Sequence, residues 1–214
     1  MAEFEIRPYR SGDREAVRSI CFETGYMGEP IDFLWRDRES FADLFSRYYT
    51  DVEPESAFVA EKTGRVVGFL LGCFDSPAVR GHGQREMSGY IRRGALVRPS
   101  IAPFLWRSIF DVVRARGAPP EALFDERWPA HLHIDFLPEA RGRGLGRRIM
   151  NAWFQRLESL GSPGVHLGTF AQNQRAIPFF EACGFARRGD PELVPGFRTR
   201  HGARMHVQWM VRSI

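Results

Sequence analysis

The segment from His131 to Leu160 constrains the fold more than any other part of the chain. Its first part, His131 to Leu137, alternates polar and apolar residues in the manner of a strand. Its last part, Gly144 to Leu160, repeats apolar residues at helical spacing. Between them lies the turn Arg-Gly-Arg-Gly-Leu-Gly at 141–146. This order predicts a strand that enters a glycine-rich turn and continues directly into a helix.

The glycine-rich turn is suited to binding an anion. Glycine lets the backbone curl so that several N–H groups approach a ligand, and a helix N-terminus adds unpaired donors and a partial positive charge. Four arginines add full charges at positions 141, 143, 147 and 148. The turn is not a dinucleotide fingerprint, because residue 147, where the last glycine of that motif would stand, is arginine. It is not a P-loop either, because no Gly-Lys-Ser/Thr follows. We therefore expect a diphosphate site of another kind.

The rest of the chain predicts a mixed α/β sheet with helices on both faces. Apolar patterning indicates strands at 4–7, 57–60, 66–74, 165–171 and 204–212, and helices near 14–21, 41–48 and 174–182. The pattern loosens between residues 76 and 129, where prolines are frequent and a helix is expected from about Ile101 to Arg114. We interpret 1–214 as a single domain with an insertion at about 76–129 that covers part of the site.

Composition limits the partners of the chain. With 43% hydrophobic and 26% charged residues it is an ordinary globular protein. A formal net charge of +4 over 214 residues is too small to indicate a nucleic-acid partner, and no apolar run is long enough for a membrane span. The first residues resemble no secretory signal, and three distant cysteines form no disulfide framework. We expect a cytoplasmic protein without nucleic-acid or membrane partners. Its oligomeric state stays open from the sequence.

Two motifs resemble those of the GNAT superfamily of acetyl-CoA-dependent acyltransferases. Arg141-x-x-Gly144-x-Gly146, after a strand ending in Leu-Pro-Glu at 137–139, resembles motif A. Asn173-x-x-Ala-x-x-Phe-Phe180-Glu-x-x-Gly-Phe resembles motif B. The resemblance implies the GNAT fold: a central, mostly antiparallel sheet with a splayed parallel strand pair and helices on both faces. It also implies acetyl-CoA as the co-substrate.

The same resemblance implies where acetyl-CoA lies. Its pyrophosphate is expected on the amides of the glycine-rich turn, its pantetheine arm along the strand end, and its thioester arm near the side chain of Asn173. The residues implied in cofactor binding are Phe136, Leu137, Arg141, Gly142, Arg143, Gly144, Leu145, Gly146, Arg147, Asn173 and Phe180.

A closer resemblance comes from the His-Leu-His-Ile-Asp strand at 131–135, the long segment before it, and Phe-Glu-Ile-Arg-Pro-Tyr at 4–9. Together these are similar to the acetyltransferase-like domain of protein O-GlcNAcases and its stand-alone bacterial relatives.

Three polar residues of the 131–137 strand are candidates for chemistry. Strand alternation puts His131, His133 and Asp135 on one face. Asp135 is expected to act as general base or to orient the acceptor ammonium, the alternative being a structural carboxylate. His133 is the second candidate base, and His131 is expected to be a buried, hydrogen-bonded imidazole. Acetyl transfer to a primary amine, small molecule or peptide, by direct attack on the thioester is the leading hypothesis.

Two other functions stay open from the sequence. The GNAT resemblance puts Phe180 where the family usually has a tyrosine that protonates the departing thiolate. Water or Tyr90 could replace that acid; otherwise the chain binds CoA without turnover, as a sensor or scaffold. The second alternative is a metal-dependent hydrolase in which His131, His133 and Asp135 hold the ion, although no metal site is expected. Cys183 is expected to pack in the core rather than act as a nucleophile.

Overall fold

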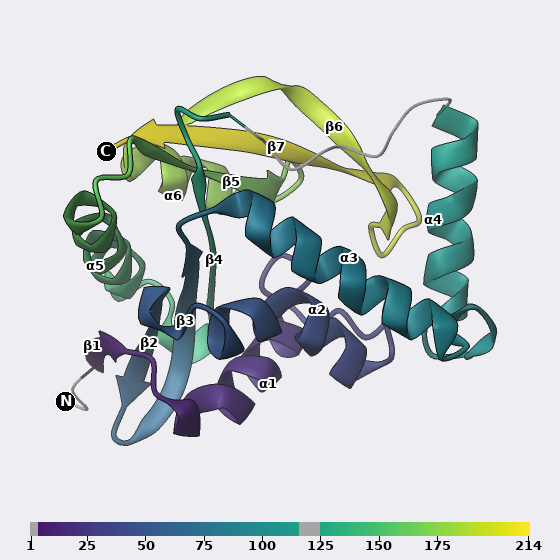
Figure 1. Ribbon diagram of the computed structural model, residues 1–214, viewed down its shortest axis with the longest axis horizontal. Helices are drawn as coiled ribbons and strands as arrows, with labels where there is room; N and C mark the ends of the chain where they lie inside the picture. The colour runs from purple at the N-terminus through teal and green to yellow at the C-terminus, as the bar shows by residue number, and fades with distance from the viewer. Residues whose placement is uncertain (1–3, 116–124) are drawn as a thin grey trace.

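One seven-stranded sheet forms the centre of the computed structural model, which describes residues 4–115 and 125–214 (Figure 1). The strands are β1 (Phe4–Pro8), β2 (Ala57–Lys62), β3 (Arg65–Cys73), β4 (Ala130–Phe136), β5 (Gly164–Phe170), β6 (Ala186–Arg198) and β7 (Arg204–Ser213). Their order across the sheet is β1-β2-β3-β4-β5-β7-β6. Among these strands β4 and β5 are paired in parallel, and the other neighbours are antiparallel.

The parallel pair separates soon after it begins. β4 and β5 are in register at Ala130–Val165 and His131–His166, and beyond these residues the two strands diverge. β4 stays paired with β3 as far as Phe136, opposite Gly68. The second half of β4 therefore has a backbone edge that β5 does not cover.

Helices cover both faces of the sheet (Figure 1). They are α1 (Arg14–Thr24), α2 (Arg38–Asp51), α3 (Ser76–Arg92), α4 (Ala102–Ala115), α5 (Leu145–Ser159) and α6 (Ala176–Ala182). Strand alternation divides the core: Phe69 and Leu71 pack with α1 and α2, whereas Leu70 and Leu132 pack with α5 and α6. The mixed fold predicted from the sequence is confirmed. None of the described helices is long and apolar enough to cross a bilayer.

Two elements differ from the sequence expectations. Residues 76–92 form α3, which three glycines and weak apolar patterning made hard to predict from the sequence. The helix packs on α2, and at its first residue the Ser76 hydroxyl donates to the Pro129 carbonyl (2.6 Å). Residues 186–198 form β6, a mostly exposed strand interrupted by irregular register and held by β7 and α4.

The expected helix near 101–114 is α4, which packs against β6. The described part of the 76–129 segment thus consists of two helices and their connections, while 116–124 lies outside the described residues. That 1–214 is one domain with an insertion here stays a prediction.

Candidate active site

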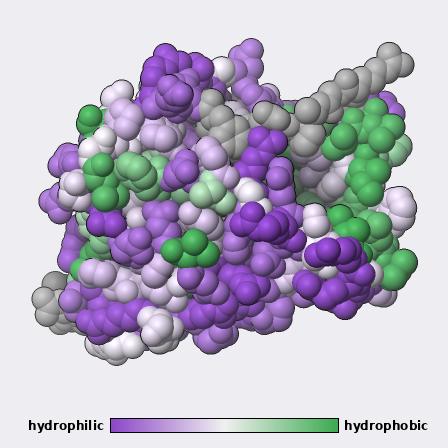
Figure 2. All heavy atoms as spheres, in the orientation of Figure 1, coloured by the Kyte–Doolittle hydropathy of each residue, from purple (hydrophilic) through white to green (hydrophobic). Residues whose placement is uncertain are grey.

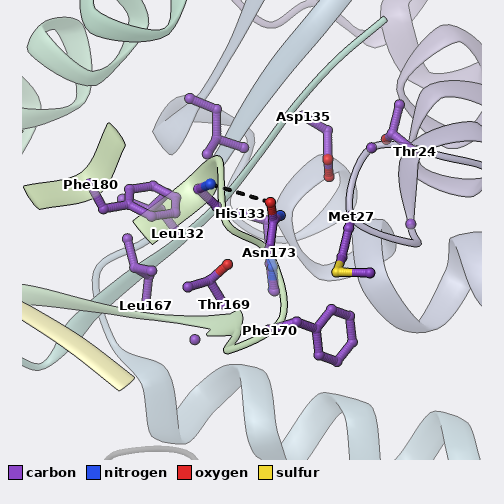
Figure 3. Close-up of a pocket in the computed structure, with 15 residues that line it drawn as sticks. Thr24, Met27, Leu132, His133, Asp135, Leu167, Thr169, Phe170, Asn173 and Phe180 are labelled. Carbon is purple, nitrogen blue, oxygen red and sulfur yellow. Dashed lines mark hydrogen bonds between the residues drawn. The ribbon is translucent and has the colours of Figure 1, made fainter. Parts of the chain in front are cut away.

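A cleft of about 470 Å³ lies where β4 and β5 diverge. It joins an inner cavity of about 190 Å³, and Asp135 and Asn173 line both (Figure 3). The cleft is lined by Met27, Gly28, Ile134, Asp135, Phe136, Ala140, Arg141, Gly142, Gly144, Leu145, Gly146, Arg147, Asn173, Arg175, Ala176, Phe179 and Phe180. None of the described residues between 76 and 129 lines either cavity.

The glycine-rich turn forms one end of the cleft. Gly142 and Gly144 have positive φ angles of 70° and 74°, and a Cβ atom at either position would meet no atom within 4 Å, so the space in front of the backbone is open. Gly146 is needed for a different reason, because a Cβ atom there would lie 2.9 Å from the Phe179 ring. α5 begins directly after Gly144. The turn therefore presents a helix N-terminus to the cleft, the arrangement that favours an anion.

The arginines of the turn divide into two groups. Arg147 lines the cleft. Arg143 lies outside the lining set, because its Nε donates to the Glu139 carbonyl (2.9 Å) and its guanidinium lies over the Phe4 ring. Arg148 donates to the Phe4 carbonyl (3.1 Å). The positive charge available to a bound anion is thus smaller than the sequence suggests.

Arg141 joins the two sides of the cleft. Its Nε donates to the Phe136 carbonyl (2.8 Å) and its Nη2 to the Gly28 carbonyl (2.6 Å). Arg175 donates to the adjacent Met27 carbonyl (3.3 Å). Met27 and Gly28 lie about 150 residues before Arg175 in the sequence, and only the fold brings them together at the cleft. Burial and the nearby Arg175 charge lower the pKa of Arg141.

The exposed edge of β4 offers backbone groups to a ligand. The Leu137 N–H donates to the Val67 carbonyl (2.9 Å), so the backbone of Leu137 faces β3. Successive residues of a strand face opposite edges, and Ile134 and Phe136 therefore face the gap toward β5. Of the two residues expected to pair with a pantetheine arm, Phe136 lines the cleft and Leu137 does not.

Asp135 is the carboxylate of the inner cavity. It lies beside Thr24 of α1, and in Figure 3 its side chain faces the space between Met27 and Asn173. Burial raises the pKa of Asp135 to about 7, although the Thr24 hydroxyl and the charge of Arg141 act in the opposite direction. A carboxylate with this pKa exchanges its proton near neutral pH, as a general base should.

The two strand histidines have different surroundings. The Tyr49 hydroxyl lies 2.5 Å from Nε2 of His131, and the Ser76 hydroxyl lies 3.0 Å from its Nδ1. Both ring nitrogens are engaged, and burial lowers the pKa of His131 far below its usual value. His133 lines the inner cavity, and burial together with His166 lowers its pKa to about 4. His133 is therefore neutral at physiological pH and a weaker base than Asp135.

The arrangement does not favour a metal centre. Among the described residues no group of three or more His, Cys, Asp or Glu side chains is placed to hold an ion. His131 would have to give up both hydrogen bonds to act as a ligand. The Nδ1 of His166 donates to the Trp128 carbonyl (2.7 Å).

Motif B supplies the opposite wall. Asn173 stabilises the turn that leads into α6, since its side-chain oxygen accepts from the Ala176 N–H (3.2 Å). Phe180 is buried and lines both cavities, on the side away from Asp135 (Figure 3). The Tyr90 hydroxyl donates to Asp43 (2.6 Å), and Tyr90 lies outside the lining of both cavities, so the structure gives it no part in the site. Cys183 is buried, and burial raises the pKa of its thiol.

A splayed parallel strand pair whose first strand leads through a glycine turn into a helix defines the class of GNAT-type acyltransferases. The family model for the Acetyltransferase (GNAT) family matches residues 23–185, and the chain belongs to this family. Members of the family transfer acetyl groups and take them from acetyl-CoA.

Solved structures agree with this assignment. The structure of SsHAT is 28% identical with a TM-score of 0.66, and the match covers 99% of this chain and 98% of that chain. A polyamine N-acetyltransferase of Drosophila melanogaster is 19% identical with a TM-score of 0.58, covering 99% and 100%. The yncA protein of Salmonella typhimurium, solved with its cofactor acetyl-CoA, is 13% identical with a TM-score of 0.57, covering 98% and 93%. The last two similarities concern the fold.

Proposed function

We propose that this protein is an acetyl-CoA-dependent N-acetyltransferase that acts on a primary amine of a small molecule or peptide by direct attack. The observation that carries the proposal is a single cleft with a glycine-rich helix N-terminus at one end and Asp135 at the other. The first suits a diphosphate, and the second suits an ammonium group that must lose a proton.

The proposed binding mode follows the cleft. The pyrophosphate of acetyl-CoA accepts hydrogen bonds from the turn amides between Gly142 and Arg147, with the charge of Arg147 beside it. The pantetheine arm pairs with the open edge of β4 at Phe136 and Ile134, which is supported by the early separation of β5. The thioester then lies near Asn173, at the junction of the two cavities.

The proposed reaction uses Asp135 as the base. The ammonium group of the acceptor gives a proton to the carboxylate, and the nitrogen lone pair attacks the thioester carbonyl carbon. The carbon–sulfur bond breaks, the thiolate of CoA leaves, and the second proton released by the nitrogen neutralises the sulfur. A base with a pKa of about 7 is matched to this task at neutral pH, whereas His133, with a pKa of about 4, is the reserve candidate.

Phe180 has no hydroxyl, so another group must carry a proton to the leaving thiolate. Two hydroxyls line the inner cavity, of Thr24 and Thr169. Thr24 donates to the Ile20 carbonyl (2.6 Å), so we assign to Thr169, whose hydroxyl faces the cavity (Figure 3), the relay of the second nitrogen proton to the sulfur. If neither this relay nor water protonates the thiolate, the chain is a CoA-binding protein without turnover, the alternative that Phe180 favours.

Two measurements separate these functions. Calorimetry with acetyl-CoA tests binding, and thiol release from acetyl-CoA over a panel of primary amines tests turnover. We expect both to be positive, with Asp135→Asn losing at least a hundredfold in rate while its acetyl-CoA affinity stays within twofold. Binding without thiol release for any amine would support the sensor or scaffold, and absence of binding would refute the acetyl-CoA site.

We also infer a closer relationship to the acetyltransferase-like domain of O-GlcNAcases and its stand-alone bacterial relatives. It is supported by the 131–135 strand and the long segment before it. The inference predicts that acceptors of those relatives belong in the amine panel.

A further inference from the structure

The corner formed by the end of α3 and by α4 has an unusual surface. Among the described residues, six of the eight exposed large hydrophobic side chains lie there: Ile91, Val97, Trp106, Ile109, Phe110 and Val113. Figure 2 shows hydrophobic side chains gathered at the edge of the molecule that α4 forms. We call these six residues the apolar corner.

Four of the six lie on α4, whose polar residues Arg107, Ser108 and Asp111 contact β6 instead of solvent. Phe104 and Leu105 are buried against the domain, with Phe104 in contact with Phe197 of β6. On the opposite side Trp106, Phe110 and Val113 are 57%, 59% and 72% exposed. Their spacing of four and three residues places them on one stripe. Large apolar side chains that gather on an exposed surface mark a binding site, so this stripe predicts a binding surface.

The exposed charges of the 88–114 stretch, which carries the apolar corner, are of one sign. Four exposed arginines flank it, at positions 92, 93, 98 and 114. Between residues 88 and 114 the sole acidic residue is Asp111. Asp111 is 1% exposed, and Arg198 and the Gly196 N–H bind its carboxylate. This stretch therefore offers no carboxylate to a partner and attracts an anionic one.

A second copy of the chain fits this surface poorly. A two-fold interface brings the same patch of both copies together, and would therefore bring the flanking arginines of one copy close to those of the other. The surface is also the outer side of a helix at the edge of the molecule (Figure 1), which suits a flat partner. Exposed tryptophan, phenylalanine and aliphatic side chains flanked by arginine are typical of protein surfaces that enter the interface of an anionic bilayer.

We propose that the apolar corner binds the surface of membranes that contain anionic phospholipids. Trp106, Phe110 and Val113 enter the boundary between headgroups and acyl chains, and the arginines contact the phosphates. The expectation that the chain has no membrane partner rested on the missing spanning segment, and surface binding of this kind needs none. No residue of the corner lines the active-site cleft, so the proposal does not depend on the proposed function.

Vesicle sedimentation of the full chain tests the proposal. We expect binding to vesicles of phosphatidylcholine with phosphatidylserine, weaker binding to phosphatidylcholine alone, and a decline with added salt. Each of Arg98→Gln and Arg114→Gln should weaken binding about fivefold, and the Phe110→Ser/Val113→Ser double variant should lose most of it. Val52→Ser is the matched control, since Val52 is 55% exposed but lies outside the corner.

Three results would overturn the proposal. The first is no sedimentation with phosphatidylserine vesicles. The second is equal binding by the native chain and the double variant, once unchanged thermal unfolding shows that the variant is folded. The third is a dimer in solution, measured by light scattering, that the double variant dissociates, because a second copy would then cover the apolar corner.

Discussion

Replacing Asp135 by asparagine should stabilise the protein, and the gain should grow as the pH rises. Asp135 has a pKa of about 7 in the folded chain, against 3.8 for an ordinary aspartate, because burial disfavours its charged form. The folded state therefore holds this proton more tightly than the unfolded state. Stability contributed by the protonated carboxyl is fully present below pH 3.8 and is lost as the pH rises to about 7. Asparagine resembles the neutral acid and does not titrate.

The size of the effect follows from the two pKa values. They lie about three pH units apart, and each unit corresponds to about 1.4 kcal/mol, so the full loss is about 4 kcal/mol. Between pH 5 and pH 8 the stabilisation of the variant over the native chain should grow by about 2–3 kcal/mol. For a domain of this size that is a difference of roughly 5–10 °C in Tm.

Thermal unfolding of the native chain and of Asp135→Asn at pH 5 and pH 8 measures this difference. Asp190→Asn is the control, because Asp190 is an exposed carboxylate on β6. A Tm difference between Asp135→Asn and the native chain that is the same at both pH values would refute a raised pKa at Asp135. It would also remove the main reason to prefer this residue as the base.

Three further predictions concern the site. The kcat/KM for acetyl transfer should rise with pH through about 7 and then level, since Asp135 must be ionised; a rate that is flat from pH 5 to 8 would contradict this. Arg147→Ala should raise the Kd for CoA about tenfold. Arg143→Ala should leave the Kd within twofold, because the Arg143 side chain donates to a carbonyl outside the cleft; calorimetry measures both Kd values. Tyr49→Phe should cost about 1–3 kcal/mol in urea unfolding, because it leaves the buried His131 without its Nε2 partner.

The glycine-rich turn and its flanking elements were predictable because their signals are local. A glycine that needs positive φ, an alternating strand and a helical repeat each depend on residues close in sequence. For the same reason the fold class and the family were accessible from 131–160 and from motif B. The face shared by His131, His133 and Asp135 also followed from strand alternation, and contacts with Tyr49 and Thr24 on that side agree with it.

Several site features needed the folded chain. Arg141 and Arg143 look equivalent in the sequence, yet Arg141 bridges β4 to the loop at Gly28, and Arg143 lies over Phe4. α3 and β6 have weak local patterns, and packing against α2 and pairing with β7 stabilise them. Met27 and Arg175 enter the cleft through contacts between segments about 150 residues apart.

The sequence by itself determined the glycine turn, the strand before it and the helix after it, since backbone conformation and apolar periodicity are set by neighbouring residues. Only the tertiary structure decided that β5 leaves β4 after His131, and that burial in the resulting cavity changes the proton affinities of Asp135 and His133 in opposite directions. Desolvation depends on everything that surrounds a group, and most of what surrounds these two side chains comes from distant parts of the chain.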